Sequence, residues 1–277
     1  MARERNAEEA RRRYAAAICG DAGLTAPRVE AAFANVPREN FLTPPPWALF
    51  APGGVMEMHS SDPADLYQDV LVVLDGQKGI NNGQPSLHAA WLAAIDPQPG
   101  EVAIHVGAGS GYYTAILAEL VTPGGHVHAY EIEPGLAEIA RENLQGLAQV
   151  TVQAASAVGA ALPQADIVYV NAGVTAPDPA WLRALREGGR LIFPWQPSAS
   201  GGVTMLVTRR EGGFEACPSL SVGFINCTGE TVRPAGAVPG ERAMAQTRSL
   251  WLLGTRAPDA SATAIYDQLW FSSEPLR

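Results

Sequence analysis

The sequence has few cysteines and no excess of basic residues, and both shortages exclude whole classes of protein. Its three cysteines, Cys19, Cys217 and Cys227, are widely spaced and form no Cys-x-x-Cys pair. A disulfide scaffold or a thiolate zinc site is therefore not indicated, and a reducing, cytoplasmic setting is expected. The 277 residues include 19 Lys and Arg against 28 Asp and Glu, a formal net charge of -9. Nucleic-acid binding by counterion release needs a basic surface, so no nucleic-acid partner is expected.

Long apolar runs are also absent. Residues 1–13 are charged and lack an apolar core, so no secretory signal is expected there. The longest uncharged stretch, residues 143–165, is rich in Gln, Ser, Thr and Gly, so neither a membrane span nor a membrane partner is expected. With 47% hydrophobic and 17% charged residues, the chain has the composition of a globular protein that buries a core. The oligomeric state stays open.

Strand-like and helix-like segments alternate through the middle of the chain. This alternation predicts an α/β fold with a doubly wound, mostly parallel sheet. Gly188 and Gly189 are typical of the end of a helix, and residues 211–213 are typical of a hairpin turn. Strands are expected at 102–106, 126–131, 150–153, 167–170 and 190–193, and helices at 113–121, 134–147 and 181–186.

The segments on either side of this core differ from it. Residues 7–35 are predicted to be helical with a break near 20–23, and residues 43–65 are predicted to form an irregular loop. Residues 229–247 are rich in Pro, Gly and Ala and predict a linker or loop. The chain is therefore divided into a helical and loop cap (1–80), a core (81–228) and a C-terminal extension (229–277).

A glycine-rich turn follows the first predicted core strand. Gly107, Gly109 and Gly111 alternate where the next helix begins, and glycine there lets the backbone turn sharply and a ligand approach closely. Glu131 ends the following strand, where a carboxylate can accept hydrogen bonds from both hydroxyls of a ribose. This order favours a nucleoside-containing ligand over a plain tight turn beside a surface acid. The G-x-G-x-G spacing disfavours a nicotinamide-dependent oxidoreductase, whose usual pattern is G-x-G-x-x-G.

Several separate motifs resemble the protein-L-isoaspartate O-methyltransferase family, whose members are class I, Rossmann-like methyltransferases that use S-adenosylmethionine. The glycine turn and Glu131 resemble motif I of this class and the acid that follows it. The resemblance covers about residues 8–228 and keeps the order of the motifs. The other matching segments are VPRENF at 36–41, YQD at 67–69, QPSLHA at 84–89 and LREGGRLIFP at 185–194.

The resemblance implies methyl transfer from S-adenosylmethionine to a carboxylate, isoaspartyl or aspartyl-like, on a peptide or protein. A carboxylate is already ionised near neutral pH, so no general base is needed. The protein would mainly hold donor and acceptor in line and exclude water. Residues 81–228 are then the donor-binding core. The resemblance implies these donor-binding residues: Asn81, Asn82, His88, Gly107, Gly109, Gly111, Glu131, Ile132, Ala155, Ser156 and Thr228.

The chain departs from the family pattern at two places. The family's active loop carries a Ser or Thr two residues before its proline, with a catalytic role for the hydroxyl, and this chain has Gly83 there. Asn82 or Gln84 is the expected replacement donor, so Asn82, Gly83 and Gln84 are the catalytic candidates. The family's Gly-Asp-Gly after the third core strand, whose acid contacts the adenine amine, is replaced by residues 154–159, with Ser156 as the expected substitute.

These departures leave other functions open. One is a methyltransferase that modifies a biosynthetic peptide or a small molecule through a changed loop. Another is an adaptor that binds the donor without transferring the methyl group. If the loop has changed to suit another acceptor, Gly83→Ser is expected to raise isoaspartyl activity.

A few polar residues have a structural and a functional interpretation. His105 lies in an apolar strand and is expected to be a hydrogen-bonded core histidine, although it is close enough to the donor to matter. His126 and His128 alternate on a strand as two metal ligands would, but no third ligand is in register, so no metal is expected. Asn171 follows a strand at the edge where ligands bind, so it either touches substrate or caps a turn.

Overall fold

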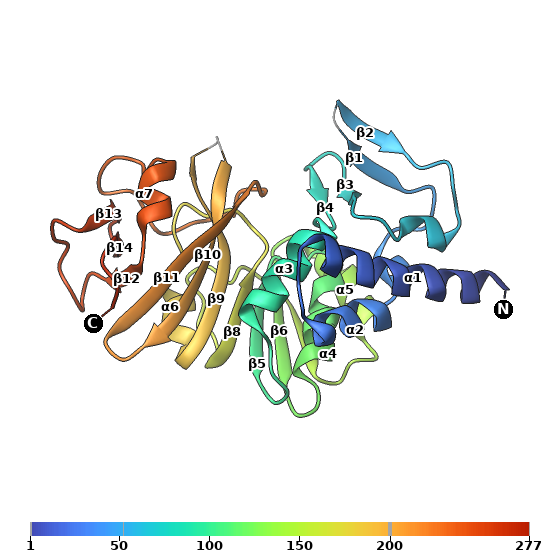
Figure 1. Cartoon of the computed structure of the whole chain (residues 1–277), viewed down its shortest axis with the longest axis horizontal. Coiled ribbons are helices and arrows are strands. Elements are labelled where there is room, and N and C mark those ends of the chain that lie inside the picture. Colours follow the sequence, from blue (N-terminus) through green and yellow to red (C-terminus); the bar gives the residue numbers. More distant parts are fainter. Residues whose placement is uncertain (1, 52, 199–200, 277) are drawn as a thin grey trace. The chain divides into compact units, whose positions relative to one another are not determined.

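The computed structural model describes residues 2–51, 53–198 and 201–276, which form two compact units (Figure 1). Unit 1 holds the described residues up to 100 together with 108–154, and unit 2 holds 101–107 together with the described residues from 155 onward. The chain passes between the units inside the predicted glycine turn. The division into cap, core and extension at residues 80 and 228 stays a prediction.

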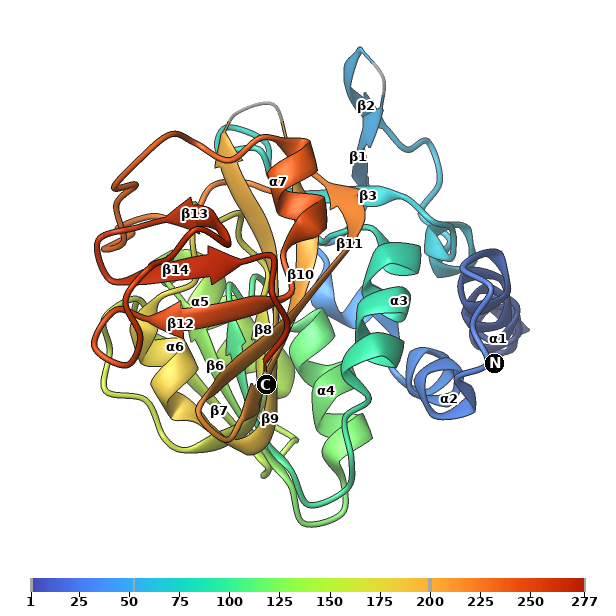
Figure 2. The ribbon, with the colours of Figure 1, turned by 60° about the vertical axis from the view of Figure 1, so that its left-hand side comes forward.

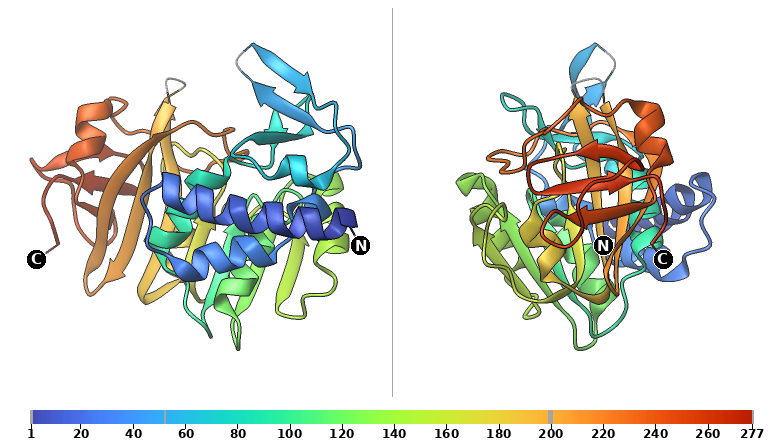
Figure 3. Two further views of the ribbon diagram at one scale, coloured as in Figure 1. Left: turned by 45° about the vertical axis from the view of Figure 1, so that its right-hand side comes forward. Right: turned by 90° about the vertical axis from the view of Figure 1, so that its left-hand side faces the viewer.

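The first two helices of unit 1 confirm the helical prediction for residues 7–35. α1 (Ala2–Asp21) ends at the predicted break, and α2 (Pro27–Asn35) begins with a proline, which suits the first turn of a helix. The two helices pack against each other and against α3 (Pro85–Ile95) (Figure 3). Their contact buries the rings of Tyr14 and Phe33, which meet edge to face with centroids 6.2 Å apart.

A four-stranded antiparallel sheet begins inside residues 43–65, so the prediction of an irregular loop there is wrong. The strand order is β2-β1-β3-β4. Trp47 and Leu49 alternate and are buried against Leu66 and Val72, which is the pattern of a strand with one buried face. Pro and Gly residues around these short strands hide that pattern in the sequence. The elements are η1 (Arg38–Phe41), β1 (Ala48–Ala51), β2 (Gly54–Glu57), η2 (Pro63–Leu66), β3 (Leu71–Asp75) and β4 (Ile80–Asn81).

The α/β part of unit 1 follows the predicted alternation. β6 and β7 are parallel neighbours, in a register that places Glu131 opposite Ala154 at their carboxyl ends. α5 buries Leu136, Ala140 and Leu144 along one face. The elements are α4 (Tyr112–Val121), β6 (His126–Glu131), α5 (Pro134–Leu144) and β7 (Val150–Ala154).

Unit 2 contains a mixed sheet in the order β5-β8-β9-β10-β11-β12-β14-β13 (Figure 2). β5, β8 and β9 are parallel, which confirms a parallel core, but every later pair is antiparallel, so the expectation of a mostly parallel sheet is wrong. The predicted hairpin across residues 211–213 is present, and a short turn of this kind can join only antiparallel strands. The strands are β5 (Val102–Val106), β8 (Ala165–Val170), β9 (Leu185–Ser198), β10 (Gly201–Arg210), β11 (Gly213–Val222), β12 (Ser249–Leu252), β13 (Ala262–Ile265) and β14 (Leu269–Ser272).

Gly188 and Gly189 lie inside β9, so the prediction that they end a helix is wrong. The preceding helix, α6 (Pro179–Ala184), has already ended. Gly188 has a φ of +75°, and a Cβ on Gly189 would lie 2.8 Å from the carbonyl oxygen of Arg186. The register between β8 and β9 shifts here, so the two glycines form a bulge at the start of the strand.

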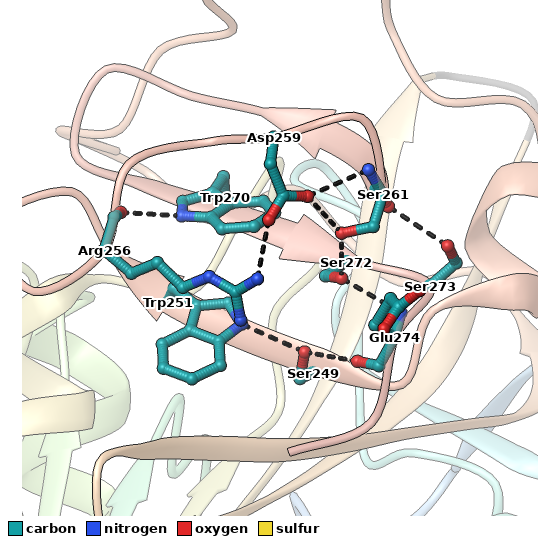
Figure 4. Close-up of polar contacts among 9 residues, drawn as sticks. All are labelled: Ser249, Trp251, Arg256, Asp259, Ser261, Trp270, Ser272, Ser273 and Glu274. Carbon is teal, nitrogen blue, oxygen red and sulfur yellow. Dashed lines mark hydrogen bonds and ion pairs between the residues drawn. The ribbon is translucent and has the colours of Figure 1, made fainter. Parts of the chain in front are cut away.

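The C-terminal extension contains ordered elements. α7 (Glu241–Gln246) lies in the segment 229–247, so the prediction of a linker is wrong for that part. Figure 4 shows Arg256 over the ring of Trp251, with its guanidinium carbon 4.6 Å from the ring centroid, and paired with Asp259 at 2.6 Å. Trp270 Nε1 donates to the carbonyl oxygen of Arg256 at 3.0 Å. These contacts fasten the loop between β12 and β13 to the neighbouring strands.

Candidate functional site

The glycine turn of unit 1 is fastened to strand β6. The N–H of Ala108 donates to the carbonyl oxygen of Tyr130 at 3.1 Å, and the N–H of Gly109 donates to Glu131 Oε2 at 2.6 Å. Gly111 precedes α4 with a φ of +98°, and a Cβ there would lie 2.8 Å from Leu144 Cδ1. The backbone conformation therefore favours glycine at residue 111, and Leu144 would have to shift to admit a side chain there.

Glu131 is a buried carboxylate at the end of β6. Its side chain is 6% exposed, and its oxygens accept hydrogen bonds from two backbone N–H groups, those of Gly109 and Glu133, the latter at 2.9 Å. Burial raises the pKa of Glu131, and these two backbone hydrogen bonds act in the opposite direction. A carboxylate offers about four acceptor positions, so Glu131 can accept from further donors. A pair of neighbouring hydroxyls, as on a ribose, can donate to these acceptor oxygens.

The residues around Glu131 add an apolar surface. Ile132 follows it directly and is 44% exposed, which is high for a large apolar side chain. Lys78, in the turn between β3 and β4, forms an ion pair with Glu133. Leu74 Cδ1 lies 3.5 Å from where a Cβ on Gly109 would be, so the end of β3 packs on the glycine turn.

The predicted catalytic residues Asn82, Gly83 and Gln84 lie together between β4 and α3. Each one already makes a hydrogen bond within unit 1. Asn82 Oδ1 accepts from Arg38 Nε at 3.0 Å, the N–H of Gly83 donates to Asn81 Oδ1 at 2.8 Å, and Gln84 Nε2 donates to Asp69 Oδ2 at 3.0 Å. The residues 81–84 are called the active loop below.

His88 occupies the space beside Gly83 where a larger side chain would lie. Its ring is buried and stacks on Tyr113, with centroids 3.6 Å apart and planes 19° from parallel. A Cβ on Gly83 would lie 2.5 Å from His88 Nε2 and 3.1 Å from Tyr113 Cε2. Tyr113 also donates through its hydroxyl to the carbonyl oxygen of Gly83 at 3.3 Å. Tyr113 was not among the residues predicted for the site, although its place just after the glycine turn was a signal.

In unit 2, His105 and Asn171 support the ends of two parallel strands. His105 is fully buried, and its Nε2 lies 2.9 Å from Asn171 Nδ2, which confirms the prediction of a hydrogen-bonded core histidine. The N–H of Asn171 donates to the carbonyl oxygen of Val106 at 2.8 Å. Gly107 has a φ of +76°, and a Cβ there would lie 3.4 Å from the carbonyl oxygen of Asn171. Whether Asn171 touches substrate stays a prediction.

The burial of His105 predicts a stability that depends on pH. Burial lowers the pKa of His105 from 6.5 to about 3. Between these two pH values the unfolded chain binds a proton at this residue that the folded protein does not. The free energy of unfolding should therefore fall as the pH falls from about 6 to 4, by up to about 1.4 kcal/mol per pH unit from this residue. Urea unfolding across this range checks the slope. His105→Gln should make the slope of the free energy of unfolding against pH shallower. An unchanged slope would contradict the contribution of His105.

The other predicted residues of unit 2 lie on loops. Ala155 and Thr228 are exposed, and Ser156 is partly buried. Ser156 Oγ accepts a hydrogen bond from the N–H of Val158 at 3.0 Å, so this hydroxyl holds its own turn. The binding roles of these three residues stay predictions.

Among the described residues, no helix is long and apolar enough to cross a bilayer. In the same part of the chain, no three His, Cys, Asp or Glu side chains are grouped so that they could hold a metal ion. His126 and His128 lie side by side with ring centroids 4.5 Å apart, and His126 Nε2 is 2.9 Å from Thr151 Oγ1. Partial burial, and secondarily His126, lower the pKa of His128.

Parallel α/β strands, a glycine turn and a buried strand-end carboxylate bonded to that turn define a class I methyltransferase that uses S-adenosylmethionine. The family model described as Protein-L-isoaspartate(D-aspartate) O-methyltransferase matches residues 21–232. The chain belongs to this family. Residues 233–277 lie outside the matched region.

Relatives and solved structures agree with this assignment. A protein-L-isoaspartate O-methyltransferase of Aeropyrum pernix is 34% identical over 230 residues, which is 80% of each chain. One of Ignicoccus hospitalis is 29% identical over 79% of this chain and 97% of its own. A solved protein-L-isoaspartate O-methyltransferase covers 95% of this chain and 88% of its own, with a TM-score of 0.66 and 21% identity. A Plasmodium falciparum structure with S-adenosyl-L-homocysteine covers 78% of this chain and 97% of its own, with a TM-score of 0.63 and 18% identity. At these identities, the two structures support the fold.

Proposed function

We propose that the protein transfers the methyl group of S-adenosylmethionine to the side-chain carboxylate of an isoaspartyl residue in a peptide or protein. Membership of the family over residues 21–232 supports this acceptor. The main support for this donor is Glu131, a buried carboxylate that backbone N–H groups hold in place and that can accept further hydrogen bonds from a ribose.

Residues of unit 1 hold the donor in this proposal. Glu131 binds the ribose, and Gly109 lets the backbone approach it without a side chain in the way. Ile132 offers its exposed apolar side chain to the adenine ring. Asn81, Asn82 and His88 contact the methionyl end. The bound donor supplies a methyl group on a positively charged sulfur. The roles of Gly107, Ala155, Ser156 and Thr228 remain those implied by the family resemblance.

The acceptor carboxylate needs no base, because it is ionised at neutral pH and attacks the methyl carbon directly. What the chain must supply is a fixed geometry, with the attacking oxygen about 3 Å from the methyl carbon and in line with the breaking bond. The active loop suits this task because its polar groups bond to neighbouring segments of unit 1. Asn82, Gly83 and Gln84 therefore contribute mainly by holding the acceptor and excluding water.

A transfer assay tests this function. The protein is incubated with methyl-labelled S-adenosylmethionine and either an isoaspartyl peptide or the matched aspartyl peptide. The proposal predicts label on the isoaspartyl peptide that is released by mild base, as expected of a carboxyl ester. Label on the aspartyl peptide alone would instead favour a changed acceptor, in line with Gly83. Donor binding without transfer to either peptide would contradict the proposal and favour the adaptor.

A further inference from the structure

The active loop is tied at both ends to one other segment, residues 66–70 between η2 and β3. Two charged side chains make these connections. Arg38 joins the segment to Asn82, at the start of the loop. Asp69, within the segment, joins it to Gln84 and Ser86, at the end of the loop and the start of α3. All these residues belong to unit 1.

Arg38 is fully buried, and its guanidinium donates to four uncharged oxygens. Its guanidinium donates to the carbonyl oxygens of Leu66 and Gln68 at 3.1 Å and of Val70 at 2.7 Å, and Nε donates to Asn82 Oδ1 at 3.0 Å. A buried charge is tolerated only where its hydrogen-bonding groups are satisfied. The guanidinium therefore holds the segment and Asn82 together in a single arrangement. The N–H of Asn82 strengthens this by donating to the carbonyl oxygen of Val72 at 2.8 Å.

Asp69 caps helix α3 from outside the helix. The first N–H groups of a helix have no partner within it, and the residue before α3, Gln84, provides no side-chain cap. Asp69 Oδ1 accepts from the N–H of Ser86 at 2.8 Å, and Oδ2 accepts from Ser86 Oγ at 2.6 Å and Gln84 Nε2 at 3.0 Å. A negative charge is also favourable at the positive end of a helix.

We propose that Asp69 is a positioning residue for methyl transfer, and that with Arg38 it forms a clamp that sets the shape of the active loop. This inference rests on the proposed function. Gly83 lies between the two anchors with a φ of +74°, a conformation that glycine adopts easily and also leaves easily. The clamp fixes the loop to residues 66–70 and so limits the movement that Gly83 would otherwise allow. Loss of the clamp should therefore lower the rate of transfer more than it weakens donor binding.

Asp69→Ala tests the clamp, because it removes both carboxylate oxygens from a position that is exposed. The first measurement needs no substrate: hydrogen exchange in peptides covering residues 82–86 should become at least tenfold faster, and peptides from α1 should not change. The second is kinetic: kcat should fall about tenfold, while binding of S-adenosyl-L-homocysteine changes less than threefold. The matched control is Asp65→Ala, at an exposed aspartate in η2, which should behave like the unmodified protein in both measurements.

Each outcome decides one statement. Unchanged exchange in Asp69→Ala would overturn the clamp. Faster exchange with an unchanged kcat would show that the loop is clamped but that the clamp does not position it for transfer, which overturns the positioning role. Absence of transfer by the unmodified protein would contradict the proposed function instead, and the exchange measurement would still decide whether the clamp exists.

Discussion

Replacing Glu131 by glutamine is expected to weaken binding of S-adenosyl-L-homocysteine by about a hundredfold or more. Both oxygens of the Glu131 carboxylate accept backbone N–H groups, from Gly109 and Glu133. A glutamine side chain has one acceptor oxygen, so its NH2 group must face one of these donors. A hydrogen bond to a charged group contributes about 1.5–3 kcal/mol, and each 1.4 kcal/mol corresponds to about tenfold in affinity.

Isothermal titration calorimetry checks this prediction, with Glu133→Gln as the matched control. Glu133 is two residues away, and its side chain is 32% exposed where it pairs with Lys78. Exposed ion pairs contribute little, so the control should bind within about threefold of the unmodified protein. If Glu131→Gln also bound within threefold while remaining folded, Glu131 would not hold the ribose.

Gly83→Ser is expected to destabilise the protein without raising isoaspartyl activity, which reverses the expectation from sequence. At a φ of +74° a residue with a side chain costs about 1–2 kcal/mol more than glycine. The added Cβ would also lie 2.5 Å from His88 Nε2, and the ring is held by its stack on Tyr113. Overpacking of this kind costs about 1–3 kcal/mol. The two costs together should lower the melting temperature by roughly 5–15 °C.

Gly79→Ser separates the two causes. Gly79 has a φ of +70°, and a Cβ there would have no atom within 4 Å, so this variant carries the backbone cost alone. Thermal unfolding should therefore rank the unmodified protein first, Gly79→Ser second and Gly83→Ser last. The double variant Gly83→Ser with His88→Ala removes the steric overlap. Its stability relative to His88→Ala alone shows how much of the loss comes from the backbone conformation. A Gly83→Ser protein with unchanged stability and higher isoaspartyl activity would contradict this account.

Local features of the sequence predicted the part of the site that depends on local conformation. The alternate glycines and Glu131 are recognisable because a turn after a strand and the acid at the next strand end keep a regular order. Strands β6 and β7 of unit 1 were predicted close to their observed bounds, because strands and helices alternate regularly through this part of the chain.

Contacts between distant segments could not be predicted in this way. Asn82 and Gln84 looked like available donors, but their partners, Arg38 and Asp69, lie 44 and 15 residues earlier in the chain. Gly188 and Gly189 resemble a helix end locally, and only pairing with β8 makes them a bulge. Strand β1 was not recognised because Trp47 and Leu49 are buried against Leu66 and Val72, which lie much further along the chain.

The most direct test of the donor site is a crystal structure of the protein with S-adenosyl-L-homocysteine. We expect both ribose hydroxyls to lie within hydrogen-bonding distance of the Glu131 carboxylate, which should keep its bonds to the N–H groups of Gly109 and Glu133. A ligand bound elsewhere, or one whose ribose makes no contact with Glu131, would contradict it.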